Sequence, residues 1–292
     1  MQYANILFLN KDYEKLVPYV DDVIKTDGSR NYLRRLLGYA AYETGDYDKG
    51  LSIMGDYFSK VQADKVIADD YDFYGKLLEK KGQDSLAAVN YLKGASLSPS
   101  NWKLKKSAGL LYVNKLKKFS DAVPLLQTAL DSLLVEGGDD ANSLDYYYLG
   151  YALERGPKNY KLADSMYTKI TELNPSSPFG YSNRARVSRQ FEPDSVDTNP
   201  AAAALFGVAK PFHDKVIELG SADVKKNKRA LTDAYLYLYA YHAIKGDNVL
   251  ALENAKKALE ISPESTDAME AIKQLEGGTP TPPTPPGGQK NK

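Results

Sequence analysis

Glycine and alanine recur along this chain in pairs about twelve positions apart, and this spacing constrains the fold more than any other feature. The pairs are Gly38–Gly50, Gly75–Ala87, Gly109–Ala122 and Gly150–Ala163, the last two with an interval of thirteen. Self-similarity with a period near 34 residues is typical of stacked helical hairpins. A small residue in the middle of a helix lets a second helix approach closely. The sequence therefore predicts an all-α solenoid.

Turn and stop signals follow the same period. Gly45, Gly82 and Gly246 lie between the two halves of their repeats, where a glycine ends a helix in the left-handed conformation. Prolines end the second helices, because a proline disfavours helical backbone before it. Pro99, Pro175 and Pro263 each follow the second small residue of their repeat by twelve positions. These signals define about seven hairpins.

The predicted hairpins have the following bounds. They run over 1–28, 31–64, 68–101, 102–137, 143–176, an irregular sixth that contains Ala185 and Ala209, and 232–264. In the sixth, Ala209 follows Ala185 by 24 residues instead of twelve, and we assign the extra length to an insertion at 191–200. Ser265 is placed to N-cap a last helix, Thr266–Glu276, that covers the final apolar face. The solenoid thus occupies residues 1–276.

Composition limits the partners and the chemistry. The chain has 38 basic and 38 acidic residues, so it lacks the positive charge that is typical of nucleic-acid binders. No stretch approaches the roughly 20 apolar residues of a membrane span. There is no cysteine, which excludes disulfides, thiolate metal sites and cysteine nucleophiles. Residues 277–292 are rich in Pro, Gly and Thr, and we predict a disordered tail there.

The motif positions resemble those of the tetratricopeptide repeat (TPR) family. Its Leu-Gly, Ala, aromatic and Pro positions are matched by Leu149-Gly150, Ala163, Tyr167 and Pro175, and again by the third hairpin. The resemblance covers residues 1–276 and implies a right-handed solenoid of helical hairpins. In this family the first helix of each hairpin lines a concave groove that binds a peptide or a partner protein.

A narrower resemblance concerns three short segments around the irregular repeat. They are Arg184-Ala185-Arg186, Glu192-Pro193-Asp194-Ser195 and Ala209-Lys210-Pro211-Phe212. They are similar to segments of repeat proteins exported to the periplasm of Gram-negative bacteria. Ala4 already occupies the position of the mid-helix small residue, so the first helix lacks its opening turn. We therefore expect a first hairpin trimmed at its N-terminus and a lost targeting segment. We therefore expect a periplasmic or envelope-associated protein, with the cytoplasm as the alternative.

The family geometry assigns candidate binding residues to inward positions of the first helices. These lie six and three before the mid-helix small residue, and one and four after it. The candidates are Tyr32, Arg35, Tyr39, Tyr42, Tyr147, Tyr151, Arg186 and Arg189. The tyrosines are expected to anchor the ligand and the two arginines to orient it through a carboxylate. The alternatives are that the tyrosines only pack between helices, and that the arginines pair with Glu154, Glu192 or Asp194.

Catalysis has little support in the sequence. The two histidines, His213 and His242, belong to different hairpins, and no phosphate-binding glycine loop remains once the repeat glycines are assigned. We attribute Asp69, Asp70 and Asp72 to a charged helix start. We therefore expect no enzyme, no metal and no cofactor, but a scaffold that binds a peptide or partner protein. The alternatives are a glycan-binding component of envelope carbohydrate uptake and a self-assembly module. The sequence leaves the oligomeric state open.

Overall fold

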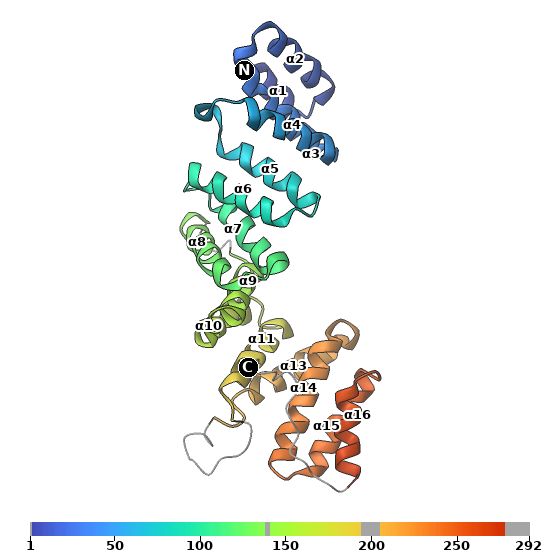
Figure 1. Cartoon of the computed structure of the whole chain (residues 1–292). Coiled ribbons are helices and arrows are strands. Elements are labelled where there is room, and N and C mark those ends of the chain that lie inside the picture. Colours follow the sequence, from blue (N-terminus) through green and yellow to red (C-terminus); the bar gives the residue numbers. More distant parts are fainter. Residues whose placement is uncertain (1, 138–140, 194–204, 278–292) are drawn as a thin grey trace. The chain divides into compact units, whose positions relative to one another are not determined.

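The computed structural model describes residues 2–137, 141–193 and 205–277 (Figure 1). The chain divides into two compact units, Met1–Ala141 (unit 1) and Asn142–Lys292 (unit 2). The predicted insertion at 191–200 lies outside the described residues from residue 194 onward, and the predicted tail at 277–292 does so from residue 278 onward. The regular secondary structure of the described residues is helical in both units, as the spacing predicts.

Unit 1 consists of four helical hairpins that follow one another in chain order (Figure 1). Its helices are α1 (Gln2–Leu9), α2 (Tyr13–Thr26), α3 (Arg34–Glu43), α4 (Tyr47–Lys60), α5 (Ala68–Lys80), α6 (Asp84–Leu97), α7 (Trp102–Leu111) and α8 (Phe119–Gly137). A 3-10 turn, Gly28–Leu33, leads into α3, and a π-helical turn, Tyr112–Leu116, extends α7. A π turn takes up one additional residue, which accounts for the longer interval between Gly109 and Ala122.

The described residues of unit 2 form three hairpins and a final helix. Its helices are α9 (Ser143–Arg155), α10 (Tyr160–Leu173), α11 (Pro178–Ser188), α13 (Lys210–Gly220), α14 (Val224–Ile244), α15 (Asn248–Ile261) and α16 (Thr266–Glu276). The irregular sixth repeat is completed by α13, which packs against α11. The last helix has the predicted bounds, and Ser265 caps it by accepting a hydrogen bond from the backbone N–H of Ala268.

The recurring small residues in the first helices lie directly against aromatic rings of the second helices. A Cβ atom added to Gly75 would lie 2.7 Å from the ring of Tyr91, and one added to Gly150 would lie 2.7 Å from the ring of Tyr167. Both tyrosine side chains are fully buried. Each glycine therefore provides the space into which the ring from the second helix packs. The turn glycines Gly45, Gly82 and Gly246 have φ angles of 83°, 71° and 79°, as their role as helix ends predicts.

One boundary differs from the prediction. We expected the seventh hairpin to begin at Thr232, but α14 begins at Val224. The side chain of Asp223 caps this earlier start by accepting a hydrogen bond from the backbone N–H of Lys226 at 3.0 Å. Leu231 is fully buried beside Gly220, so the additional turns pack against the end of α13. None of the helices in the described ranges combines the length and apolar composition of a membrane span.

Candidate functional site

In unit 1, two of the predicted binding residues contact a buried carboxylate. Asp70, in the first turn of α5, accepts hydrogen bonds from the hydroxyl groups of Tyr39 (2.6 Å) and Tyr57 (2.7 Å) and from the backbone N–H of Ile67 (2.9 Å). The guanidinium of Arg35 lies 3.2 Å from the same carboxylate. Burial and the negative charge of Asp70 raise the pKa of Tyr39 and of Tyr57, so both hydroxyls remain hydrogen-bond donors.

These contacts give Tyr39 and Arg35 a structural role inside unit 1. The Tyr39 side chain is only 4% exposed, and the Arg35 guanidinium is committed to Asp70. Both residues therefore join the second hairpin to the third from inside the unit. They leave little surface for a partner.

The other two predicted residues of unit 1, Tyr32 and Tyr42, stay partly exposed. The Tyr42 ring lies edge-on to Phe73 at 5.7 Å, and Phe73 stacks on Tyr39 at 4.0 Å. The ammonium group of Lys76 lies 4.8 Å from the centre of the Phe73 ring. Tyr42 thus belongs to a small aromatic surface bordered by a cation. Tyr32 lies apart from it, next to Arg35.

In unit 2, the predicted tyrosines lie together on α9. The rings of Tyr147 and Tyr151 stack with centres 5.7 Å apart, and Tyr147 also contacts the ring of Phe179 on α11 at 5.2 Å. Phe179 is 39% exposed and Leu144, at the start of α9, is 55% exposed. We call these four residues, Leu144, Tyr147, Tyr151 and Phe179, the α9–α11 surface. All four occupy inward positions of successive first helices.

Arg186, the next predicted residue, forms a two-pronged ion pair with Glu154 of α9. Its Nε and Nη2 atoms lie 2.9 and 2.7 Å from the two carboxylate oxygens, and the hydroxyl of Tyr167 donates to the same carboxylate at 3.0 Å. Burial disfavours the charged guanidinium, but the hydrogen bonds and charge of Glu154 outweigh this and raise the pKa of Arg186. Arg186 is thus permanently charged, and Glu154 neutralises that charge locally.

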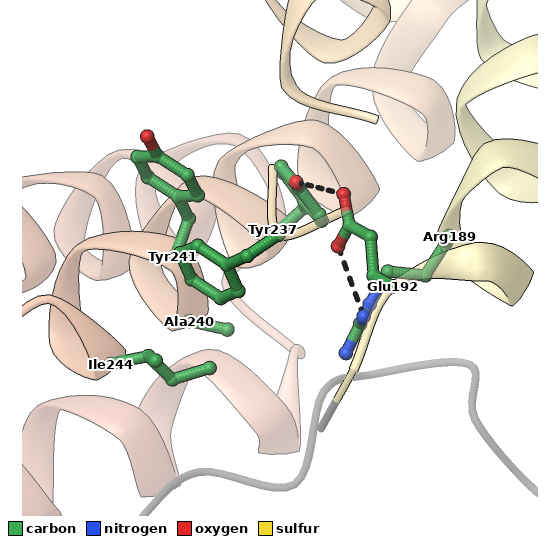
Figure 2. Close-up of a pocket in the computed structure, with 7 residues that line it drawn as sticks. Arg189, Glu192, Tyr237, Ala240, Tyr241 and Ile244 are labelled. Carbon is green, nitrogen blue, oxygen red and sulfur yellow. Dashed lines mark hydrogen bonds and ion pairs between the residues drawn. The ribbon is translucent and has the colours of Figure 1, made fainter. Parts of the chain in front are cut away.

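Arg189 is also paired internally, through a single contact with Glu192 (Figure 2). The buried Glu192 carboxylate accepts from Arg189 at 3.0 Å, from the hydroxyl of Tyr237 at 2.7 Å and from the backbone N–H of Ala209 at 2.7 Å. A small hollow lies beside this cluster, with apolar walls from α14. It is lined by Arg189, Glu192, Phe206, Tyr237, Ala240, Tyr241 and Ile244. Of the two interpretations of the arginines, internal pairing is therefore the one that the structure shows.

The sequence predicts Glu154 and Glu192 as partners of the arginines, but it does not predict that Asp70 pairs with Arg35. Asp70 lies in the charged first turn of α5, as predicted, and it also organises the contact between two hairpins. The sequence does contain a signal for these ion pairs, namely opposite charges about one repeat period apart. Both Arg35–Asp70 and Glu154–Arg186 have this spacing. Within the ranges that the structure describes, no three histidine or carboxylate side chains come close enough to hold a metal ion.

His213 on α13 provides a pH-dependent prediction. Its ring stacks on Tyr237 at 4.0 Å, and burial together with the charge of Arg189 lowers the pKa of His213 to about 3. The unfolded chain, with a histidine pKa of about 6.5, therefore binds a proton that the folded unit does not. Stability should fall as the pH drops below about 6.5, by about 1–2 kcal/mol at pH 5, given that the ring keeps some exposure.

Urea unfolding at pH 7 and pH 5 tests this prediction, with His213→Phe as the matched variant because it keeps a ring against Tyr237 without a titrating group. The variant should lose less stability than the wild type between the two pH values. Equal losses in the two proteins would contradict the assignment.

The comparisons with known proteins agree with this geometry. No protein-family model matches the sequence, and no curated protein matches it. Among solved structures, the C-terminal part of a TPR repeat-containing protein from Cytophaga hutchinsonii superimposes with a TM-score of 0.67 and 29% identity, over 93% of this chain and 98% of that chain. YrrB, described as a TPR protein with an unusual peptide-binding site, gives a TM-score of 0.52 and 22% identity over 70% of this chain and 92% of its own.

Structures named MamA are also similar to this chain. MamA AMB-1 has a TM-score of 0.51 and 20% identity over 67% of this chain and 94% of its own. Identities of this size show the fold alone, whereas the Cytophaga structure extends over nearly the entire chain. Together with the repeat columns and the hairpins that they form, these similarities identify the chain as a tetratricopeptide repeat protein.

Proposed function

We propose that this chain is a non-enzymatic protein-interaction scaffold that binds a segment of another protein on the α9–α11 surface. The observation that carries the proposal is the partial exposure of large apolar side chains at inward positions of successive first helices. Leu144 and Phe179 are 55% and 39% exposed, and Phe179 contacts the half-buried Tyr147. Aromatic anchors of this kind supply most of the affinity in many interfaces. The peptide-binding site described for YrrB supports the same class of function.

The ion pair between Arg186 and Glu154 defines the chemistry of the segment. An arginine that already forms a two-pronged pair gains little from a second carboxylate. The surface therefore favours a segment that contributes apolar or aromatic side chains rather than an acidic terminus. Arg186, held in place by the buried Glu154, supplies a polar edge near the rings that can donate to backbone carbonyls of the segment.

The two alternatives from the sequence receive less support. A sugar ring needs an open aromatic face, but Tyr147 and Tyr151 already stack on each other with an interplanar angle of 17°. Self-assembly, the other alternative, would appear as a concentration-dependent oligomer of the chain in light scattering. We also propose that the protein lies in the periplasm or cell envelope. This proposal rests on the short resemblances near Arg186 alone, and fractionation of the source cells would test it.

The binding proposal is tested with the double variant Leu144→Ser, Phe179→Ser. Both side chains are exposed enough that the fold should survive, and loss of two anchors should weaken partner binding by at least about thirtyfold, or about 2 kcal/mol. Affinity purification from the source cells with quantitative mass spectrometry identifies the partner, and titration calorimetry then gives the affinity.

Leu173→Ser on the second helix α10 is the matched control, since that leucine has a similar exposure of 47%. It should leave binding unchanged. Recovery of the same partner by the double variant, or specific binding to a glycan array in place of any protein, would overturn the proposal.

A further inference from the structure

The second helix of the third hairpin, α6, carries an apolar stripe on its exposed side. Leu86, Val89 and Leu97 are 54%, 45% and 52% exposed. Their spacing of three and eight residues places them on one face of the helix, and Lys93 falls between them on the same face. The stripe extends over three helical turns, about 16 Å. We call Leu86, Val89, Lys93 and Leu97 the α6 stripe.

This stripe departs from the pattern of the chain's own repeats. Leu86 and Val89 lie one before and two after the second small residue, Ala87. In every other hairpin, at least one of the two corresponding positions holds a polar residue or a proline. The corresponding pairs are Lys15 and Pro18, Lys49 and Ser52, Asp121 and Pro124, Leu162 and Ser165, Val208 and Pro211, and Leu250 and Glu253. The fold therefore does not require apolar residues at this place in α6.

The charge on the stripe distinguishes between possible occupants. Lys93 is its only charged residue, and the ammonium group of Lys93 lies 5.8 Å from the centre of the Tyr71 ring. Among the residues that the structure describes, no carboxylate lies within ion-pair distance of Lys93. A second copy of the chain fits poorly, because antiparallel pairing that matches Leu86 with Leu97 of the copy brings the two Lys93 ammonium groups together near the symmetry axis. A partner with a carboxylate at this place has no such conflict.

We infer that the α6 stripe binds an amphipathic helix of another protein, at least three turns long, whose apolar face carries a carboxylate opposite Lys93. Leucine-type side chains of the partner cover Leu86, Val89 and Leu97, as an apolar helix face does in other helix-recognition sites. The carboxylate of the partner pairs with the lysine inside an apolar border, where water screens the pair less than in bulk solvent. This surface lies in unit 1 and is independent of the proposed α9–α11 site.

Two synthetic amphipathic peptides of about 18 residues test the inference. They are identical except for the central residue of the leucine face, which is Glu in one peptide and Lys in the other. The Glu peptide should bind the full chain at least fivefold more tightly than the Lys peptide and should shift the methyl NMR signals of Leu86, Val89 and Leu97. Lys93→Glu should reverse the preference between the two peptides.

Val89→Glu should abolish binding of the Glu peptide, whereas Ser52→Glu, at the corresponding position of α4, should leave it unchanged. If Val89→Glu does not fold by circular dichroism, Leu97→Ser replaces it with the same expected loss. Equal affinity for the two peptides, or chemical-shift changes that leave α6 unaffected, would overturn the inference. A dimer of the chain alone that disappears in Val89→Glu on sedimentation would also overturn it.

Discussion

Asp70→Ala is expected to lower the free energy of unfolding of unit 1 by about 3–5 kcal/mol, the range for removing one partner of a buried ion pair. The substitution removes the acceptor for Tyr39 and Tyr57 and leaves the Arg35 guanidinium without its carboxylate. Buried donors without acceptors are costly because they have given up water without replacement. The loss should therefore exceed the value of any single hydrogen bond in the cluster.

Repeat proteins can unfold locally, so the effect is best measured at each helix. Amide hydrogen exchange should accelerate in α3 and α5, which the cluster joins, and much less in α8. Asp69→Ala is the matched control. The carboxylate of Asp69 is next to Asp70 in the sequence but is exposed, so it should contribute no more than about 0.5 kcal/mol to stability. Tyr39→Phe, which removes one donor and keeps the ring on Phe73, should cost about 1–2 kcal/mol. Equal effects of the Asp69 and Asp70 variants would contradict this role for Asp70.

The fold of the chain could be predicted because its signals are local. Gly75 and Gly150 provide space for the rings of Tyr91 and Tyr167 in the partner helix of the same hairpin. Gly45 ends a helix through its own backbone conformation. Such effects depend on residues within about one repeat, so their spacing in the sequence is sufficient. The start of α14 was misplaced because it depends on tertiary packing of Leu231 beside Gly220 and on capping by Asp223.

The candidate site could be predicted only in part, because exposure is decided by neighbours one repeat away. Tyr39 and Tyr42 are three residues apart and both occupy inward positions, yet only Tyr42 stays partly open. The difference arises from Phe73, which stacks on Tyr39, and from Asp70, which binds its hydroxyl. Column positions show which way a residue points. They do not show whether the side chain of that residue is already bound by another residue of the protein.

Glu192→Ala is expected to destabilise unit 2 by about 3–5 kcal/mol, because it removes one carboxylate that serves three donors. Arg189 would remain as a mostly buried charge without its partner, and the Tyr237 hydroxyl would lose its acceptor (Figure 2). The backbone N–H of Ala209 would lose the same acceptor. These donors come from the end of α11, from α14 and from the residue before α13. Glu192 therefore fixes both ends of the irregular repeat to α14 of the next hairpin.

Glu218→Ala on α13 is the control, since that exposed carboxylate pairs only with Lys215 across one helical turn and should contribute less than about 0.5 kcal/mol. Glu192→Gln keeps an acceptor for Ala209 and Tyr237 but loses the charge that faces Arg189, so its cost should lie between those of the other two variants. Urea unfolding with hydrogen exchange in α11, α13 and α14 provides the measurement. A Glu192→Ala protein as stable as the Glu218→Ala protein would show that packing of α13 and α14, rather than this carboxylate, holds the irregular repeat together.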